Sequence, residues 1–74
     1  MSGIDSFVGA KIAEARAERN LSRKQLSEQI GIPEAQLLTL ELGFSRPSGE
    51  TLLRIAEILE MPLPFFFPPD QSKI

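Results

Sequence analysis

The chain has 74 residues, of which 42% are hydrophobic and 24% are charged, so it is long enough for one small globular domain with a single core. It contains no cysteine and no histidine, which excludes disulfides and thiol nucleophiles and removes the commonest metal ligands and general base, so we expect no metal, cofactor or enzymatic activity. The net charge is −2 and the isoelectric point is near 5.0, whereas nucleic-acid-binding domains are often basic.

The N-terminal part of the chain predicts a short lead-in followed by a helix. Residues 1–5 contain turn-forming Ser and Gly, and we expect them to be flexible. A helix is predicted from about Ser6 to Arg19, because apolar residues recur there at intervals of four and three: Val8, Ile12 and Ala15. Asn20 should end it. Because the sequence has neither a signal-like start nor an apolar run of about 20 residues, we expect a cytoplasmic protein with no membrane partner.

The next segment, Leu21 to Gly43, predicts two short helices joined by a tight turn. Ser22 is a good N-cap for the first of them, and Gly31 permits the sharp reversal. Pro33 suits the first turn of the second helix, which runs to about Leu42 with Gly43 as its stop. This pattern is typical of a helix-turn-helix, whose second helix normally lies in the DNA major groove.

The C-terminal third predicts one more helix and a proline-rich end. Ser48 can cap this helix, and its apolar residues follow the i, i+3, i+4, i+7 pattern of a core-facing helix: Leu52, Ile55, Ala56 and Leu59. It should end before Pro62, and Phe65 to Phe67 can form at most a short helical turn between prolines. We therefore expect one domain over residues 6–67, with a tail over 68–74.

The predicted fold is all-α, a compact bundle of four to five helices that contains the helix-turn-helix. Its core should consist of apolar residues from every helix: Val8, Ile12, Leu26, Ile30, Leu37, Leu40, Leu52, Ile55, Ala56, Leu59 and Phe66.

The segment from Val8 to Phe67 resembles the Cro and phage-repressor class of helix-turn-helix domains, the XRE family. The resemblance rests on residues spread over about four-fifths of the chain: Gly9, Arg16, Leu21, Ser22, Leu26, Gly31, Glu41, Gly43, Pro47, Leu52, Ala56, Leu59, Leu63, Phe66 and Phe67. It implies the lambda-repressor-like fold and a partly buried ion pair between Arg16 and Glu41. Ser27 stands where the family usually has a small Ala, and serine is small enough to keep the close approach of the two helices.

The resemblance also assigns the residues that would contact a DNA operator: Arg23, Lys24, Glu34, Ala35, Leu38, Thr39 and Arg46. Arg23 and Arg46 fall where family members hold phosphate. The second helix of the motif carries no Lys or Arg, however, so its base-reading positions are poor in the side chains that usually contact DNA.

The same surface has an apolar character that favours a protein partner. Its expected outward residues are Glu34, Leu38, Thr39, Leu42 and Phe44. From this pattern we predict a small transcriptional regulator whose recognition face binds another transcription-regulatory protein, in the manner of an antiactivator, with weak or no DNA binding. Scattered surface leucines with no function are the plain alternative.

Two other functions stay open at this point. The first is a homodimeric, sequence-specific DNA-binding repressor of the Cro/XRE type, and the second is an antitoxin-like subunit that binds both protein and DNA. Ile58 and Phe65 either form an apolar dimer contact or simply complete the core. An enzyme is the least favoured class, because no nucleophile, base and orienting group can be assembled.

Overall fold

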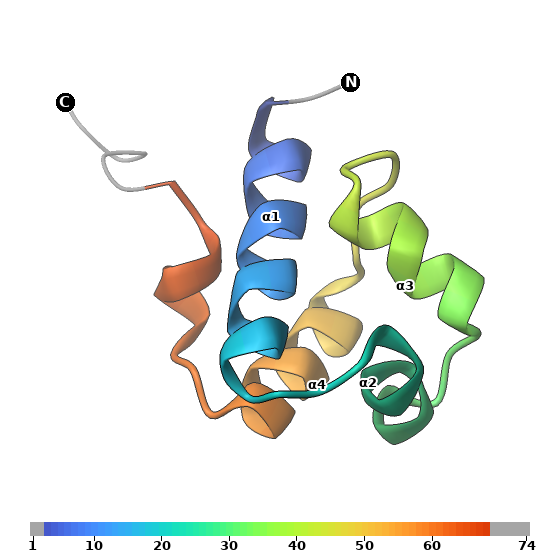
Figure 1. Ribbon diagram of the computed structural model, residues 1–74. Helices are drawn as coiled ribbons and strands as arrows, with labels where there is room; N and C mark the ends of the chain where they lie inside the picture. The colour runs from blue at the N-terminus through green and yellow to red at the C-terminus, as the bar shows by residue number, and fades with distance from the viewer. Residues whose placement is uncertain (1–2, 69–74) are drawn as a thin grey trace, which may run out of the picture.

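The computed structural model describes residues 3–68, which form four α-helices and one short 3-10 helix, with no strand among them (Figure 1). The elements are α1 (Gly3–Glu18), α2 (Arg23–Ile30), α3 (Glu34–Glu41), α4 (Gly49–Leu59) and η1 (Leu63–Phe66). In Figure 1, α1 stands between α3 and η1, which pack against it from opposite sides, and α2 contacts both α3 and α4. The expected all-α helix-turn-helix bundle is confirmed.

The first helix begins earlier than the sequence predicts. Residues 3–5, which we expected to be part of a flexible lead-in, form the first turn of α1. Asp5 suits this position because a negative charge is favourable at a helix N-terminus. Arg46, from the loop between α3 and α4, donates from Nε to Asp5 Oδ1 at 2.7 Å. This contact joins residues far apart in the chain, so local periodicity does not reveal it. Residues 1–2 lie outside the described residues.

Two other boundaries also differ slightly from the prediction. Pro33 is the N-cap of α3 rather than part of its first turn. The last helical turn, η1, spans Leu63–Phe66 instead of Phe65 to Phe67, because Pro64 provides a suitable φ angle early in a 3-10 turn. Of the expected tail, Pro68 is described, and residues 69–74 lie outside the described part of the chain.

A left-handed residue follows each α-helix at or just after its C-cap. These residues are Asn20 (φ 59°), Gly31 (φ 91°), Gly43 (φ 82°) and Glu60 (φ 58°). At each end the next amide bonds back to the carbonyl five residues earlier, with N···O distances of 3.0–3.1 Å, which is the Schellman arrangement. Asn20 was predicted in this role. Glu60 has the least favourable backbone conformation of the four, because the left-handed region is disfavoured for residues other than Gly and Asn.

The core matches the prediction residue by residue. All eleven predicted core residues are buried, Ala15 joins them, and Ile12, Leu26, Leu37, Ile55, Leu59 and Phe66 are the largest of the fully buried side chains. Phe65 packs edge-on against Phe66 with 5.2 Å between ring centroids. Ile58 and Phe65 are partly buried against this core, as the core-completing interpretation of these two residues predicts.

The close approach of α1 and α3 depends on Gly9. A Cβ at this position would lie less than 3.0 Å from the carbonyl oxygens of Leu40 and Glu41, so no larger residue fits without moving backbone. Because Gly9 has no side chain, the last turn of α3 rests directly on α1. This contact fixes the orientation of α3, the helix on which the candidate interface depends.

Candidate nucleic-acid interface

Both ends of α2 are tightly defined, and the second of them leads into α3. The Ser22 hydroxyl accepts a hydrogen bond from the Gln25 amide at 2.9 Å, and the Gln25 side chain accepts one from the Ser22 amide at 2.7 Å. This capping box satisfies two amides at the start of α2. Gly31 ends α2 in the left-handed conformation that glycine adopts without strain, and the extended Pro33 then starts α3. The predicted helix-turn-helix is therefore present.

The outer face of α3 is exposed at every residue except Thr39. Leu37, Leu40 and Glu41 are buried, while the other face carries Glu34, Ala35, Gln36, Leu38 and Thr39, followed by the C-cap Leu42. Thr39 is partly buried, and its hydroxyl donates to the Ala35 carbonyl oxygen at 3.0 Å. The hydroxyl proton of Thr39 is thus used within the helix.

Gln36 is an exposed residue of α3 that the sequence reasoning missed. At 100° per residue it lies about 200° around the helix from Glu34, so Glu34 and Gln36 border opposite edges of the exposed face. An amide is a good partner for an adenine edge, which makes Gln36 a candidate contact. Helical geometry alone could have found it, since it is neither a core position nor a cap.

Glu41 links all three helices around the turn. Its carboxylate accepts from Arg16 at Nε (2.7 Å) and Nη2 (3.2 Å), and from Arg23 Nε at 3.0 Å. The Glu41 side chain is only 3% exposed, against 16% for Arg16 and 34% for Arg23. Arg16 also donates from Nη1 to the Leu21 carbonyl oxygen at 3.0 Å. The structure thus contains the expected ion pair and adds Arg23 to it.

This network changes the role expected for Arg23. The resemblance assigns this residue to DNA, whereas here its Nε is bound to a buried carboxylate of α3. Within residues 3–68, Arg23 is hydrogen-bonded through Nε alone, so its two Nη groups can still hold a phosphate. Glu41 therefore anchors Arg23 at the start of α2 and reduces the net charge that it offers to a polyanion.

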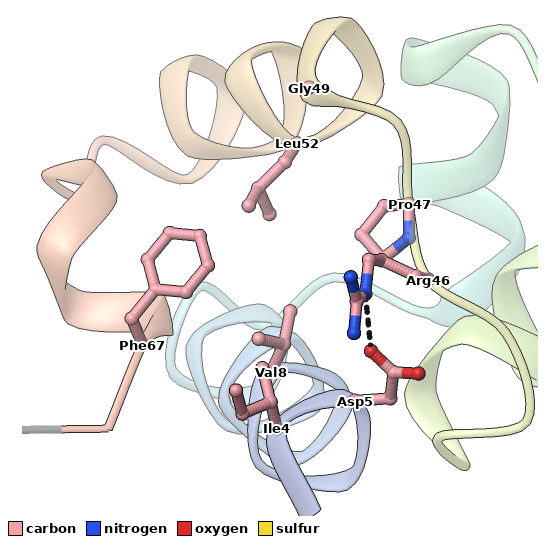
Figure 2. Close-up of a pocket in the computed structure, with 8 residues that line it drawn as sticks. All are labelled: Ile4, Asp5, Val8, Arg46, Pro47, Gly49, Leu52 and Phe67. Atoms are coloured by element: carbon pink, nitrogen blue, oxygen red, sulfur yellow. Dashed lines mark hydrogen bonds and ion pairs between the residues drawn. The ribbon is translucent and has the colours of Figure 1, made fainter. Parts of the chain in front are cut away.

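Arg46 is likewise paired with an acid. Its Nε donates to Asp5 Oδ1 at 2.7 Å, while the Arg46 side chain stays 65% exposed (Figure 2). Behind this pair lies a cavity of about 310 Å³, walled mainly by apolar residues of α1, α4 and the chain after η1, among them Val8, Leu52 and Phe67. The third residue expected to contact phosphate, Lys24, is exposed and forms no ion pair with another described residue.

The outer face of α3 and the residues that follow it carry three exposed apolar side chains: Leu38 (38% exposed), Leu42 (52%) and Phe44 (67%). Leu38 and Leu42 are one helical turn apart, so they form the strip that the sequence predicted. On the opposite side of α1, Phe66 is buried in the core, Phe65 is partly buried beneath Lys11, and Phe67 is 41% exposed.

The comparisons with known proteins agree with this geometry. The family model for helix-turn-helix domains matches residues 12–66. The chain belongs to the HTH_3 helix-turn-helix family, the Cro/phage-repressor or XRE class. An uncharacterized HTH-type transcriptional regulator of Rickettsia conorii is 42% identical over 64 residues, which cover 86% of this chain and 51% of that protein. The Escherichia coli regulator SutR is 32% identical, over 97% of this chain and 40% of its own length.

Solved structures place the fold in the same class. The chain matches Bacillus thuringiensis PlcR, determined in complex with the peptide PapR7 and DNA, with a TM-score of 0.76 and 34% identity over 82% of this chain and 21% of PlcR. The chain spans about half the length of the curated relatives it matches. The matched residues thus form a helix-turn-helix domain of the XRE class.

Two further observations concern other kinds of site. Within residues 3–68, no helix is both long enough and apolar enough to span a lipid bilayer. Over the same part of the chain, no three acidic side chains gather in a way that could hold a metal ion.

Proposed function

We propose that this domain binds DNA as part of a homodimeric transcriptional regulator, with α3 in the major groove. The observation that carries this proposal is the presentation of α3. The inner face of α3 is held against α1 by the close contact at Gly9 and by the hydrogen bonds of Glu41. Its outer face is exposed to solvent between Glu34 and Leu42. Phosphate contacts then come from the start of α2 and from Arg46 in the loop that follows α3.

The relatives support this proposal over a regulator-protein target. They are named transcriptional regulators, and the PlcR structure, at 34% identity, contains DNA. The side of the domain that carries η1 faces away from α3 and exposes Leu63 and Phe67 (Figure 1). A second copy bound there would leave both recognition helices free, as a two-fold operator requires.

The charges predict modest affinity with a measurable salt dependence. Arg23, Lys24 and Arg46 give two to three phosphate contacts per protomer, and two of these side chains already bind carboxylates. For a dimer with four to six contacts, the slope of log affinity against log salt should be about −4 to −5. A strongly basic domain with twice as many contacts would show a slope about twice as steep.

The test is a fluorescence-anisotropy titration against duplexes enriched from a random library at low salt. We expect an enriched duplex, the slope given above, and weaker binding in Lys24→Ala and Arg46→Ala. Arg19→Ala is the matched control, because Arg19 pairs with Glu60 at the end of α4 and should not affect binding. No enrichment at about 50 mM salt, or equal effects of all three variants, would contradict the proposal.

A second candidate function rests on the exposed strip of Leu38, Leu42 and Phe44. An apolar strip of this kind on the recognition face also suits a regulator protein, which the chain would then block as an antiactivator. A photo-crosslinking amino acid at position 42 separates the two functions in cells. A DNA adduct supports the main proposal, and a discrete protein adduct that Leu38→Glu abolishes supports the second.

A further inference from the structure

We infer that α3 selects its operator through thymine methyl groups, with Ala35 and Leu38 as the specificity-determining residues. This inference rests on the proposed DNA binding and specifies the base chemistry that the interface reads. The major groove shows four distinct edges, and only thymine presents a methyl group there. On the exposed face of α3, Ala35 and Leu38 are matched to that group, while Gln36 at the edge of the face is matched to adenine.

The first step of the argument concerns guanine. Guanine is read most often by an Arg or Lys that reaches its O6 and N7 atoms, and α3 has neither residue between Glu34 and Glu41. The nearest arginine of the motif, Arg23, is anchored by its Nε to Glu41, at the far end of α3. Glu34 would repel the guanine acceptors. The helix therefore lacks the Arg or Lys donors that most often read guanine.

The second step concerns what the same face offers. Ala35, Leu38 and Leu42 are exposed and recur at intervals of three and four, so they form one apolar ridge along the helix. Thr39 borders this ridge and has its hydroxyl proton bound to the Ala35 carbonyl oxygen at 3.0 Å. Because that donor is satisfied within the helix, the ridge and its Thr39 border present mainly methyl and methylene groups to the groove.

The third step concerns position along the helix. Recognition helices contact base edges mainly through their N-terminal residues. Ala35 is the second and Leu38 the fifth of the eight residues of α3, so both lie within the helix. Leu42 and Phe44 lie beyond its C-terminal end, where they contact the edge of the site at most. We therefore assign thymine contact to Ala35 and Leu38 and leave Leu42 outside the specificity set.

The experiment replaces thymine by deoxyuridine, which keeps every hydrogen-bonding group and removes only the methyl. The probe is the duplex enriched from the random library, with each thymine substituted in turn. At one or two positions per half-site we expect uracil to lower the affinity about fourfold, as removal of one buried methyl predicts. In Leu38→Ala, the thymine-to-uracil affinity ratio should fall to about one at one of these positions.

Leu53→Ala is the matched control, because Leu53 is an exposed leucine on α4 and should leave all ratios unchanged. The ratio is internal to each variant, so a general loss of affinity does not imitate the expected result. Ratios near one at every thymine, with the wild-type protein bound to its duplex, would overturn this inference and leave the proposed function standing. Failure of any duplex to be enriched would overturn both.

Discussion

The carboxylate of Glu41 provides the sharpest test of how the interface is held. It is 3% exposed and accepts three hydrogen bonds from two arginines, at 2.7, 3.2 and 3.0 Å. Glu41→Gln removes the negative charge while keeping the size of the side chain. Loss of one partner from a buried pair costs about 3–5 kcal/mol, and because Arg16 and Arg23 keep some access to water we expect about 2–4 kcal/mol here.

Urea unfolding followed by circular dichroism at the helix band measures this loss, which suits a chain without Trp or Tyr. For a domain of this size, 3 kcal/mol corresponds to a fall in Tm of roughly 12–24 °C. Arg16→Met should cost a similar amount. In Arg16→Met/Glu41→Met, both buried charges are replaced by apolar groups, so the loss should be clearly smaller than the sum of the single losses. Additive losses would refute this account of the network.

Three further predictions concern other single sites. Gly9→Ala should lower the free energy of unfolding by about 3 kcal/mol in the same urea assay, because its Cβ would collide with backbone of α3, whereas Gly49→Ala has open space and should be neutral or stabilising. Glu60→Gly should raise the stability by about 1 kcal/mol, since glycine relieves the left-handed residue at φ 58° and only an exposed ion pair is lost. Asp5→Asn should tighten DNA binding about two- to fivefold in the anisotropy titration, because it releases Arg46 for phosphate.

Each of these has a clear contrary result. Equal stability of the two alanine variants would show that α1 and α3 do not approach as closely as described. A destabilised glycine variant at position 60 would mean that the helix C-cap carries no strain. Unchanged or weaker DNA binding after release of Arg46 would place that arginine outside the phosphate contacts.

Local signals in the sequence were sufficient for most of the fold. The apolar spacing of the α-helices predicted all of their core positions but Ala15, and Ser22, Gly31 and Ser48 marked turns and caps whose chemistry is confined to a few neighbouring residues. The predicted start of α1 was wrong because its first turn contacts Arg46, which is 41 residues away from Asp5. Hydrophobic periodicity does not reveal contacts between residues so far apart in the chain.

The site was predicted less completely than the fold, for a related reason. The ion pair of Arg16 with Glu41 came from the family resemblance, whereas the second arginine on that carboxylate, Arg23, follows from nothing local in the sequence. Both arginines assigned to phosphate are therefore partly neutralised by acids on other elements. The exposed strip at Leu38 and Leu42 was predicted correctly, because helical spacing alone decides which residues of a short helix point outward.

The most direct test of the central claim is an NMR titration of the ¹⁵N-labelled domain with its enriched duplex. If α3 enters the major groove, the largest amide shift changes should fall on Ser22 to Lys24, on Glu34 to Thr39 and near Arg46. The amides of η1 and of the C-terminal half of α4 should change little. Shift changes concentrated on η1, with α3 unaffected, would contradict the assignment of this face to DNA.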